Sequence, residues 1–438
     1  MQRMTSLTPG DDASRRHFLM DLFSEATRSA LPEHCLSPHL PPAPKGRLVV
    51  FAIGKAAASM AAAAEAHYAG AGARIEGIAL TRYGHGRPTA HVEIVEASHP
   101  VPDMAGLAAS ERLLALAATL GPDDLALVLL SGGGSALATL PIAGVTLADK
   151  QALTRALLAS GAPIGEINCV RKHLSRIKGG RLAAAIHPAH MVTLAISDVA
   201  GDDPSVIASG PTVPDPTTRE DALTILERYG IEVPDHVHTA LLSAPESPKP
   251  GDPVFAGNTY ELVASGAYAL DAAANMAAAS GYEIVNLGDR VEGEARDVAA
   301  AHAKLALDAK AAGRRVAILS GGETTVTFAK GAESGRGGRN QEYALALAIA
   351  LHAAPGIAAI AGDTDGIDGG SESDDPAGAL VLPTTLGRAE ALGLDAAASL
   401  KCHNSGGFFA ALGDLVVTGP SYTNINDFRA ILVEGGPA

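Results

Sequence analysis

The sequence has little cysteine, and it has no apolar run long enough to span a bilayer. Cys35, Cys169 and Cys402 are widely spaced and include no CxxC pair, which argues against structural zinc and is typical of a reducing compartment. Basic residues are also scarce, because 33 of them stand against 48 acidic residues and give a net charge of −15. This charge argues against nucleic acid or an anionic membrane as a partner. We therefore expect a cytoplasmic protein that binds neither.

Two common phosphate-binding fingerprints are absent as well. The segment that ends in Lys55 is no P-loop, because Val49 stands where the first glycine should be and Ala56 follows the lysine. The nearest fragment of a GxGxxG motif, at 84–86, continues into Arg87-Pro88 rather than into a helix. Standard P-loop and dinucleotide sites are therefore both disfavoured.

The first part of the chain resembles an export signal but lacks its apolar core. The residues at 14–19 look like a twin-arginine motif, and Asp21, Glu25 and Arg28 then interrupt the uncharged stretch that such a signal needs. The apolar side chains recur at helical spacing instead. We expect an amphipathic first helix.

The chain is long enough for several domains, and its first clear unit is a strand, a turn and a helix. With 438 residues, of which 47% are hydrophobic and 18% charged, two or three globular domains are expected. A buried strand at 47–53 stops at Gly54-Lys55, and an alanine-rich helix follows at 56–69. We place Lys55 in the first helical turn, where the dipole disfavours a cation unless an anion also lies there. A lysine that simply reaches solvent is the alternative.

Small residues follow two other apolar strands, predicted at 125–130 and 316–319. The first strand leads into Ser131, Gly132, Gly133, Gly134 and Ser135, and the second into Ser320, Gly321 and Gly322. Small side chains let backbone N–H groups approach an anion, so the two turns suggest two anion-binding loops. Tight turns against neighbouring helices are the alternative.

Arginine and glycine alternate in the stretch that we regard as central to the chain. After a strand predicted at 324–328, Arg336 and Arg339 stand among three glycines, just before an alanine- and leucine-rich helix. Fixed cations on a glycine frame at a helix start suit a phosphate or carboxylate ligand. A solvated hairpin loop is the alternative.

Charged segments and one histidine offer further candidate residues. The basic run at 168–182 is usually a solvated helix face, although it could steer a ligand. Asp198 follows a predicted strand, and Asp365 lies in a second acidic loop. Such positions suit Mg²⁺, which takes one or two carboxylates plus phosphate oxygens and water, and they equally suit capping and turns. His99, in a proline-rich loop, could contact a ligand or be structural.

The second half is predicted to begin after a linker. Residues 246–253 are rich in proline and polar side chains, so we place domains at 1–245 and 246–438. In the second domain we expect a helix at 260–279 and a last strand at 414–418.

Taken together, these motifs resemble the glycerate 2-kinase family, whose C-terminal half is the MOFRL domain. They run in one order over nearly the whole chain. The segments that carry the resemblance are Gly54-Lys55, SHPVPD at 98–103, LSGGGSAL at 130–137, NCVRKHLSRIKGGRLA at 168–183, SDVAGDDPSVIASGPTVPDPTT at 197–218, SGGETTV at 320–326, GRGGRNQE at 335–342, DTDGIDG at 363–369 and ALGDLVVTGP at 411–420.

The resemblance implies an α/β protein with a Rossmann-like N-terminal domain, a second α/β (MOFRL) domain and an active site in the cleft between them. It implies ATP- and Mg²⁺-dependent phosphorylation of D-glycerate at the 2-hydroxyl, which gives 2-phosphoglycerate and ADP. We expect a monomer or homodimer. Lys55 and an arginine of the glycine-rich loop are the catalytic cations that it implies, with Arg339 as the first choice and Arg336 as the second.

Phosphoryl transfer needs positioning and charge neutralisation more than covalent help, which agrees with these residues. The glycine-rich turns would hold phosphate oxygens, and Asp198, Glu323 or Asp365 would hold Mg²⁺. Asp198 could instead accept the proton of the substrate hydroxyl. Two other classes stay open: an NAD(P)H-dependent hydroxypyruvate reductase, which the missing GxGxxG disfavours, and a non-catalytic binder of small carboxylates.

Overall fold

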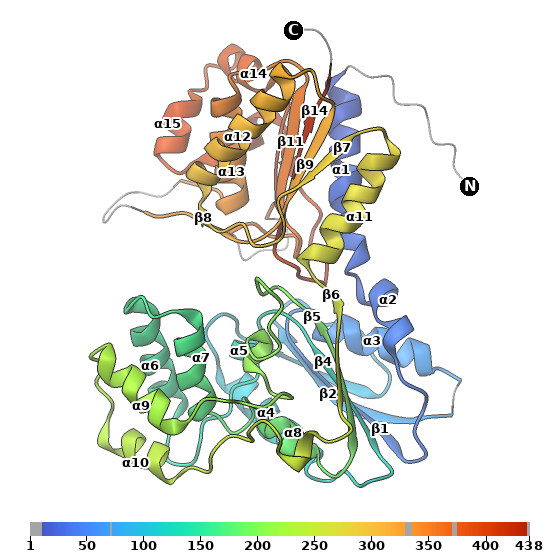
Figure 1. Cartoon of the computed structure of the whole chain (residues 1–438), viewed down its shortest axis with the longest axis vertical. Helices are drawn as coiled ribbons and strands as arrows, with labels where there is room; N and C mark the ends of the chain where they lie inside the picture. The colour runs from blue at the N-terminus through green and yellow to red at the C-terminus, as the bar shows by residue number, and fades with distance from the viewer. Residues whose placement is uncertain (1–10, 71, 329–334, 370–374, 436–438) are drawn as a thin grey trace. The chain divides into compact units, whose positions relative to one another are not determined.

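The computed structural model describes residues 11–70, 72–328, 335–369 and 375–435, and it forms two compact units (Figure 1). The N-terminal unit is Pro32–Val263, and the C-terminal unit combines Met1–Leu31 with Ala264–Ala438. These units do not coincide with the domains predicted at 1–245 and 246–438. The first helix packs with the second unit, and the last strand of the first sheet follows the predicted linker. Within the described ranges, no helix has the length and apolarity that crossing a membrane would require.

The N-terminal unit contains a six-stranded sheet with the strand order β3-β2-β1-β4-β5-β6. Its strands are β1 (Arg47–Ile53), β2 (Arg74–Arg82), β3 (Val92–Ala97), β4 (Leu125–Leu130), β5 (His190–Ile196) and β6 (Thr259–Ala264). The pairs β1–β2, β1–β4, β2–β3 and β4–β5 are parallel. This order is that of a Rossmann-type doubly wound sheet, so the predicted fold of this domain is confirmed.

Helices cover both faces of this sheet, which explains why β1 and β4 are buried along almost their whole length. On one face, α4 (Met104–Ala117) and α8 (Arg181–Ile186) pack against alternate side chains of the strands, among them Val49 and Phe51. On the other face lies α3 (Ala57–Tyr68).

Segments before and after β5 together form a helical cluster with a core of its own. Its helices are α6 (Leu147–Ala159), α7 (Ile164–His173), α9 (Arg219–Arg228) and α10 (Asp235–Ser243), and the last two follow β5. Short elements complete the unit: α2 (Pro32–Cys35), α5 (Gly134–Leu137), and the 3₁₀ turns η1 (Ser37–His39), η2 (Ile207–Ser209) and η3 (Pro253–Phe255). The cluster matters for the site because α6 and α7 reach the carboxyl end of β4.

The C-terminal unit contains a mixed sheet with the order β13-β12-β11-β14-β9-β7. Only β7–β9 is a parallel pair among those described, and the other neighbours are antiparallel. Its elements are α1 (Asp12–Ser29), α11 (Gly266–Ala279), β7 (Glu283–Asn286), β8 (Gly293–Glu294), α12 (Ala295–Ala311), β9 (Val316–Ser320), β10 (Thr324–Thr325), α13 (Arg339–Leu351), β11 (Ile357–Asp363), β12 (Gly378–Val381), α14 (Thr385–Ala391), α15 (Ala396–Lys401), α16 (Ser405–Leu412), β13 (Leu415–Val416) and β14 (Asp427–Val433).

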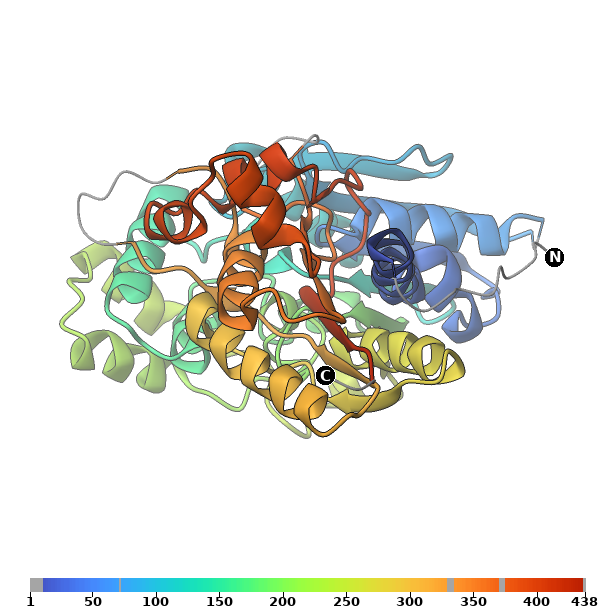
Figure 2. The ribbon, with the colours of Figure 1, turned by 90° about the horizontal axis from the view of Figure 1, so that it is seen from above.

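The second sheet also lies between two helical layers. The helices α12 and α13 run side by side on one face, and α1 and α11 pair on the other (Figures 1 and 2). The predicted amphipathic first helix is confirmed, because Phe18, Leu19, Leu22, Phe23 and Ala26 are buried along one side of α1.

Three predictions of local structure were wrong. Residues 260–264 belong to strand β6 rather than to a helix, because Tyr260 and Leu262 pack on the first sheet with strand periodicity. The strand predicted at 324–328 ends at Thr325, since Thr327 N donates to the side-chain Oε1 of Glu294 at 3.3 Å instead of to a backbone carbonyl of the neighbouring strand. The strand predicted at 414–418 is limited to β13.

Candidate functional site

Two turns meet beside the point where the strand order of the first sheet reverses. The strand order reverses between β1 and β4, and ligands of such sheets bind beyond the carboxyl ends of the strands at this point. Lys55, after β1, donates its backbone N–H to Gly132 O at 2.8 Å, and Ala56 N donates to Ser131 Oγ at 3.0 Å. The lysine turn and the serine-glycine turn are therefore fixed to each other.

Gly133 shows how tightly the second turn is packed. Its φ is +80°, and a Cβ atom there would lie 3.0 Å from His99 Nε2 and 3.3 Å from Lys55 Cγ. The side chains of His99 and Lys55 thus both lie against this turn, as the sequence suggested. One detail differs: α3 begins at Ala57, so Lys55 precedes the helix and the prediction that places it in the first helical turn was wrong.

The rest of the predicted set in this unit lies at the same edge of the sheet. Ser135 Oγ is 2.7 Å from Ser209 Oγ, which ties the turn to the long loop after β5. Asp198, two residues beyond the end of β5, is half-buried in the first part of that loop. The geometry is compatible with either of its predicted roles, as Mg²⁺ ligand or as base, and both stay predictions.

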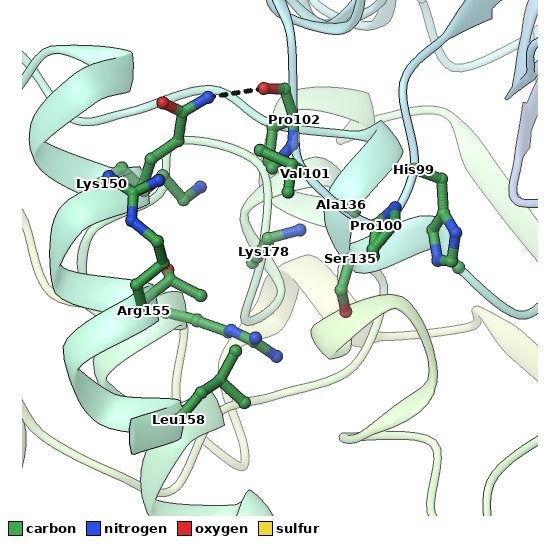
Figure 3. A pocket seen from close by; sticks show the side chains of 14 residues that line it. His99, Pro100, Val101, Pro102, Ser135, Ala136, Lys150, Arg155, Leu158 and Lys178 are labelled. Carbon is green, nitrogen blue, oxygen red and sulfur yellow. Dashed lines mark hydrogen bonds between the residues drawn. The ribbon is translucent and has the colours of Figure 1, made fainter. Parts of the chain in front are cut away.

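A pocket of about 270 Å³ lies beside the serine-glycine turn, within the N-terminal unit (Figure 3). It is bounded by α6, by α7 and by the loop at 99–102, which Gln151 Nε2 holds to α6 by donating to Pro102 O at 2.7 Å. Its lining includes the side chains of His99, Ser135, Lys150, Arg155, Arg171 and Lys178. We call this the cationic pocket, because no carboxylate is among the described residues that line it.

Two of these cations, Lys150 and Lys178, are buried, and the half-buried Arg171 lies near them. Lys150 is only 5% exposed, and its Nζ has no hydrogen-bond partner in the described part of the chain. Burial and the nearby Arg171 guanidinium lower the pKa of Lys150 to about 7. Burial also lowers the pKa of Lys178 strongly, with Lys150 and Arg171 adding to the effect. Lys178 Nζ donates to Ala138 O at 2.9 Å.

Only a weak signal for this pocket is present in the sequence. Arg171 and Lys178 belong to the basic run, for which a solvated helix face is the common interpretation, whereas Lys178 is 1% exposed. Lys150 was missed altogether. It precedes Leu153 and Leu157 at helical spacing, on the buried face of α6, and a lysine at such a core position is the signal that could have found it.

In the C-terminal unit, Arg339 is surrounded by carboxylates. Its guanidinium bonds Asp427 at 2.9 Å, Asp363 at 3.0 Å and Glu323 at 2.8 Å. Burial opposes the charge, but these three acids together raise the pKa of Arg339 above its ordinary value. The positive charge that was predicted to meet a ligand anion is therefore balanced within the chain.

The backbone N–H groups at the start of α13 are likewise bonded by a side chain of the protein. Asp368 accepts hydrogen bonds from Asn340 N at 3.0 Å and from Gln341 N at 2.9 Å, so its carboxylate takes the place that we expected for a phosphate. Burial raises the pKa of Asp368 to about 6, although these two bonds oppose the shift.

The second serine-glycine turn has a structural explanation. Gly322 has a φ of +96°, and a Cβ there would lie 2.4 Å from Val291 O. Gly321 N donates to Gly288 O at 2.9 Å. Ser320, at the end of β9, is 2% exposed. Close backbone packing therefore accounts for these small residues, and their predicted contact with phosphate oxygens stays a prediction.

The remaining candidates differ in how accessible they are. Arg336 is exposed, and its backbone rather than its side chain is held, by Asn404 Oδ1 at 3.1 Å. Asp365 is buried and accepts from Ile367 N at 2.9 Å. Within the described ranges, no group of three or more His, Cys, Asp or Glu side chains is arranged to hold a metal ion. Residues 329–334 of the central stretch lie outside the described residues.

Two family models match the chain: a domain of unknown function, DUF4147, over residues 18–242, and the MOFRL family over residues 316–427. A D-glycerate 2-kinase of Thermotoga maritima is 40% identical over 423 residues, which are 95% of this chain and 98% of that protein. The chain belongs to the glycerate kinase family. The resemblance seen in the sequence is thereby confirmed.

Other members of the glycerate kinase family extend the comparison. The crystal structure of a Thermotoga maritima glycerate kinase matches with a TM-score of 0.88 at 39% identity, and the match covers 96% of this chain and all of that one. An Agrobacterium vitis protein is 52% identical over 427 residues, which are 97% of this chain and 95% of its own. That relative is provisionally named a hydroxypyruvate reductase. Names within the family therefore point to two different reactions.

Proposed function

We propose that the chain phosphorylates D-glycerate at its 2-hydroxyl, using ATP and Mg²⁺, and releases 2-phosphoglycerate and ADP. The observation that carries this proposal is the cationic pocket beside the serine-glycine turn at the sheet's switch point. Both the acid and the nucleotide are anions, and this part of the unit concentrates positive charge in a chain with a net charge of −15. The name of the Thermotoga relative supports the same reaction.

Within this proposal, the candidate site residues of the N-terminal unit have different roles. The backbone N–H groups of Gly132 to Gly134 hold phosphate oxygens, for which a turn of small residues with positive φ is suited. Lys55, packed against that turn, neutralises charge on the transferring phosphoryl group. Asp198 orients the substrate hydroxyl or accepts its proton, or binds Mg²⁺.

The three predicted Mg²⁺ ligands differ in how accessible they are. Asp198 is half-buried beyond β5, and a single carboxylate there is enough for an ion that takes its other ligands from phosphate and water. Glu323 is bonded to Arg339, and the side chain of Asp365 accepts from a backbone N–H. When bound, Mg²⁺ would supply charge neutralisation on the phosphates.

We expected Arg339 rather than Arg336 to be the catalytic arginine of the glycine-rich loop, and the proposal reverses this order. Arg339 bonds three carboxylates, so we propose that it is a positioning residue that holds Asp363 and Asp427 in place. Arg336 is exposed, and the proposal gives it the contact with a ligand anion.

The competing reaction is reduction of hydroxypyruvate, which the name of the Agrobacterium relative favours. Parallel assays separate the two. One follows ADP release with D-glycerate and Mg²⁺-ATP, and the other follows NADH and NADPH oxidation with hydroxypyruvate. We expect turnover only in the first assay, and a Lys55→Met variant that folds normally should lose about a hundredfold in kcat. Oxidation of NAD(P)H without ADP release would replace the kinase by the reductase.

A further inference from the structure

We propose that the cationic pocket holds the carboxylate of the acid substrate, with Lys150, Arg171 and Lys178 as its binding groups. The inference rests on the proposed phosphorylation of D-glycerate, and it names the part of the site that recognises the acid. Neither Lys150 nor the pocket was singled out by the sequence, and α6 carries no motif of its own.

The first argument is electrostatic. Lys150, Arg171 and Lys178 line the same pocket, and no carboxylate is among the described residues that line it. Burial, with the nearby Arg171 adding to the effect, lowers the pKa of both lysines. Like charges buried together without a counter-ion cost stability, and an anionic ligand removes that cost. Such an arrangement is expected where a ligand supplies the missing charge.

The second argument comes from Lys150 itself. A structural lysine in a core normally has its ammonium group hydrogen-bonded, as Lys178 does with the carbonyl oxygen of Ala138. Lys150 is as deeply buried, yet its Nζ has no partner in the described part of the chain, and the residue lines the pocket. Its N–H donors are thus available to an oxyanion, and a bound anion favours the protonated form.

The third argument is size, and it separates the acid from the nucleotide. The pocket measures about 270 Å³, which is below the roughly 300–1,000 Å³ of pockets for larger organic ligands. A three-carbon acid fits such a volume, whereas a nucleoside triphosphate is much larger. The lining is also partly apolar, through Pro100, Val101 and Leu158, which suits a short carbon chain.

The position of the pocket agrees with this assignment. Gly133 and Ser135 of the serine-glycine turn belong to its lining (Figure 3). An acid whose carboxylate is bound by Lys150 therefore lies next to the turn that we propose for the phosphates of ATP. In the same view, Lys178 lies between α6 and the loop that carries His99.

Equilibrium binding tests the inference without requiring turnover. Calorimetry would measure the Kd of D-glycerate, and separately of Mg²⁺-ATP, for the wild type, Lys150→Met and Arg171→Met. Lys45→Met is the matched control, because it makes the same chemical change at an exposed lysine of the same unit. We expect Lys150→Met to weaken D-glycerate binding by about tenfold or more, since one charge-assisted hydrogen bond is lost, and to leave the Kd of ATP unchanged.

A thermal unfolding curve shows whether weaker binding of D-glycerate by Lys150→Met comes from loss of folded protein. Lys150→Met removes a buried, repelled charge, so the variant should melt at a higher temperature than the wild type while it binds the acid less well. Lys45→Met should change neither property.

The possible outcomes are distinct. An unchanged Kd for D-glycerate in folded Lys150→Met, absence of D-glycerate binding to the wild type, or weaker binding of ATP alone would each overturn the inference. Binding that depends on Lys150, in an enzyme that releases no ADP, would keep the acid site and refute the proposed kinase. Turnover in which Lys150→Met leaves the KM for D-glycerate unchanged would keep the proposed kinase and refute the acid site.

Discussion

Arg336 and Arg339 stand three residues apart, and their surroundings give them opposite properties. Replacing Arg339 by lysine keeps one positive charge beside Asp427 and Asp363 but loses the planar group that bonds both at once, while Asp427 keeps its ion pair with Arg429. The loss of these charge-assisted hydrogen bonds should lower the free energy of unfolding by about 2 kcal/mol. Arg336→Lys should leave the unfolding free energy unchanged and reduce kcat/KM at least tenfold, because a lysine cannot form a bidentate contact. Denaturant unfolding and steady-state kinetics of both variants check this.

The assignment would be contradicted if Arg339→Lys kept full stability while its kcat collapsed. In that case Arg339 would contact the substrate, as the sequence first suggested.

A buried histidine of the C-terminal unit should make stability depend on pH. His302 Nδ1 lies 2.8 Å from the Tyr343 hydroxyl, and burial, with a smaller contribution from Arg429, lowers the pKa of His302 to about 4. The unfolded chain binds the proton first, so this contribution is present above about pH 6.5 and is lost as the pH falls toward 4. Its size is of the order of 3 kcal/mol.

Urea unfolding at pH 7.5 and at pH 5 measures this loss. His302→Asn, which keeps a polar atom near Tyr343, should show a smaller fall in unfolding free energy between the two pH values than the wild type. His91→Asn, at an exposed position, is the control and should behave as the wild type does. Equal pH dependence in all three proteins would remove His302 from the account.

At the scale of elements, the turn after β1 depends on a glycine. Gly54 has a φ of +134°, and a Cβ there would lie 2.2 Å from Ser131 Oγ. Gly54→Ala should therefore destabilise the N-terminal unit by about 3 kcal/mol, through backbone strain and overpacking. Gly121→Ala is the control, because a Cβ at Gly121 meets no atom within 4 Å. Thermal unfolding of the two variants tests this, and equal stability would show that the two turns are not locked together.

Elements with a strong local pattern were predictable from the sequence, and short ones were not. The strands β1 and β4 are continuous apolar runs followed by glycine, so both their existence and their ends could be placed. Strand β6 was missed because the break between the strand and the alanine-rich helix, at Ser265-Gly266, is short enough to pass for part of the helix. The short strands β10 and β13 end where side chains or loops take over the backbone hydrogen bonds.

The candidate site was predictable only where its residues directly follow a strand that the sequence itself indicates. Lys55 and the serine-glycine turn could be found from their strands, because parallel strands bring their carboxyl ends to one edge. The carboxylates around Arg339 come from separate segments, and no local pattern shows that they meet. Lys150 was missed for a similar reason, since its burial depends on α7 and on the loop that carries His99.

At the scale of the whole molecule, a net charge of −15 is combined with a pocket that is lined by cations alone among its charged groups. The acidic surface disfavours polyanions such as nucleic acid, and the cationic pocket admits a small anion. Together with the Rossmann-type sheet order and the glycerate kinase family, this distribution of charge is the basis of the proposed reaction.

Phosphorus NMR of the reaction product tests the proposed phosphorylation of D-glycerate at its 2-hydroxyl. The wild-type protein would be incubated with D-glycerate, ATP and Mg²⁺, and the phosphorylated acid would be identified against authentic standards. We expect 2-phosphoglycerate and an equal amount of ADP. 3-Phosphoglycerate would contradict the proposed position of phosphorylation, and no phosphorylated acid at all would contradict the kinase assignment.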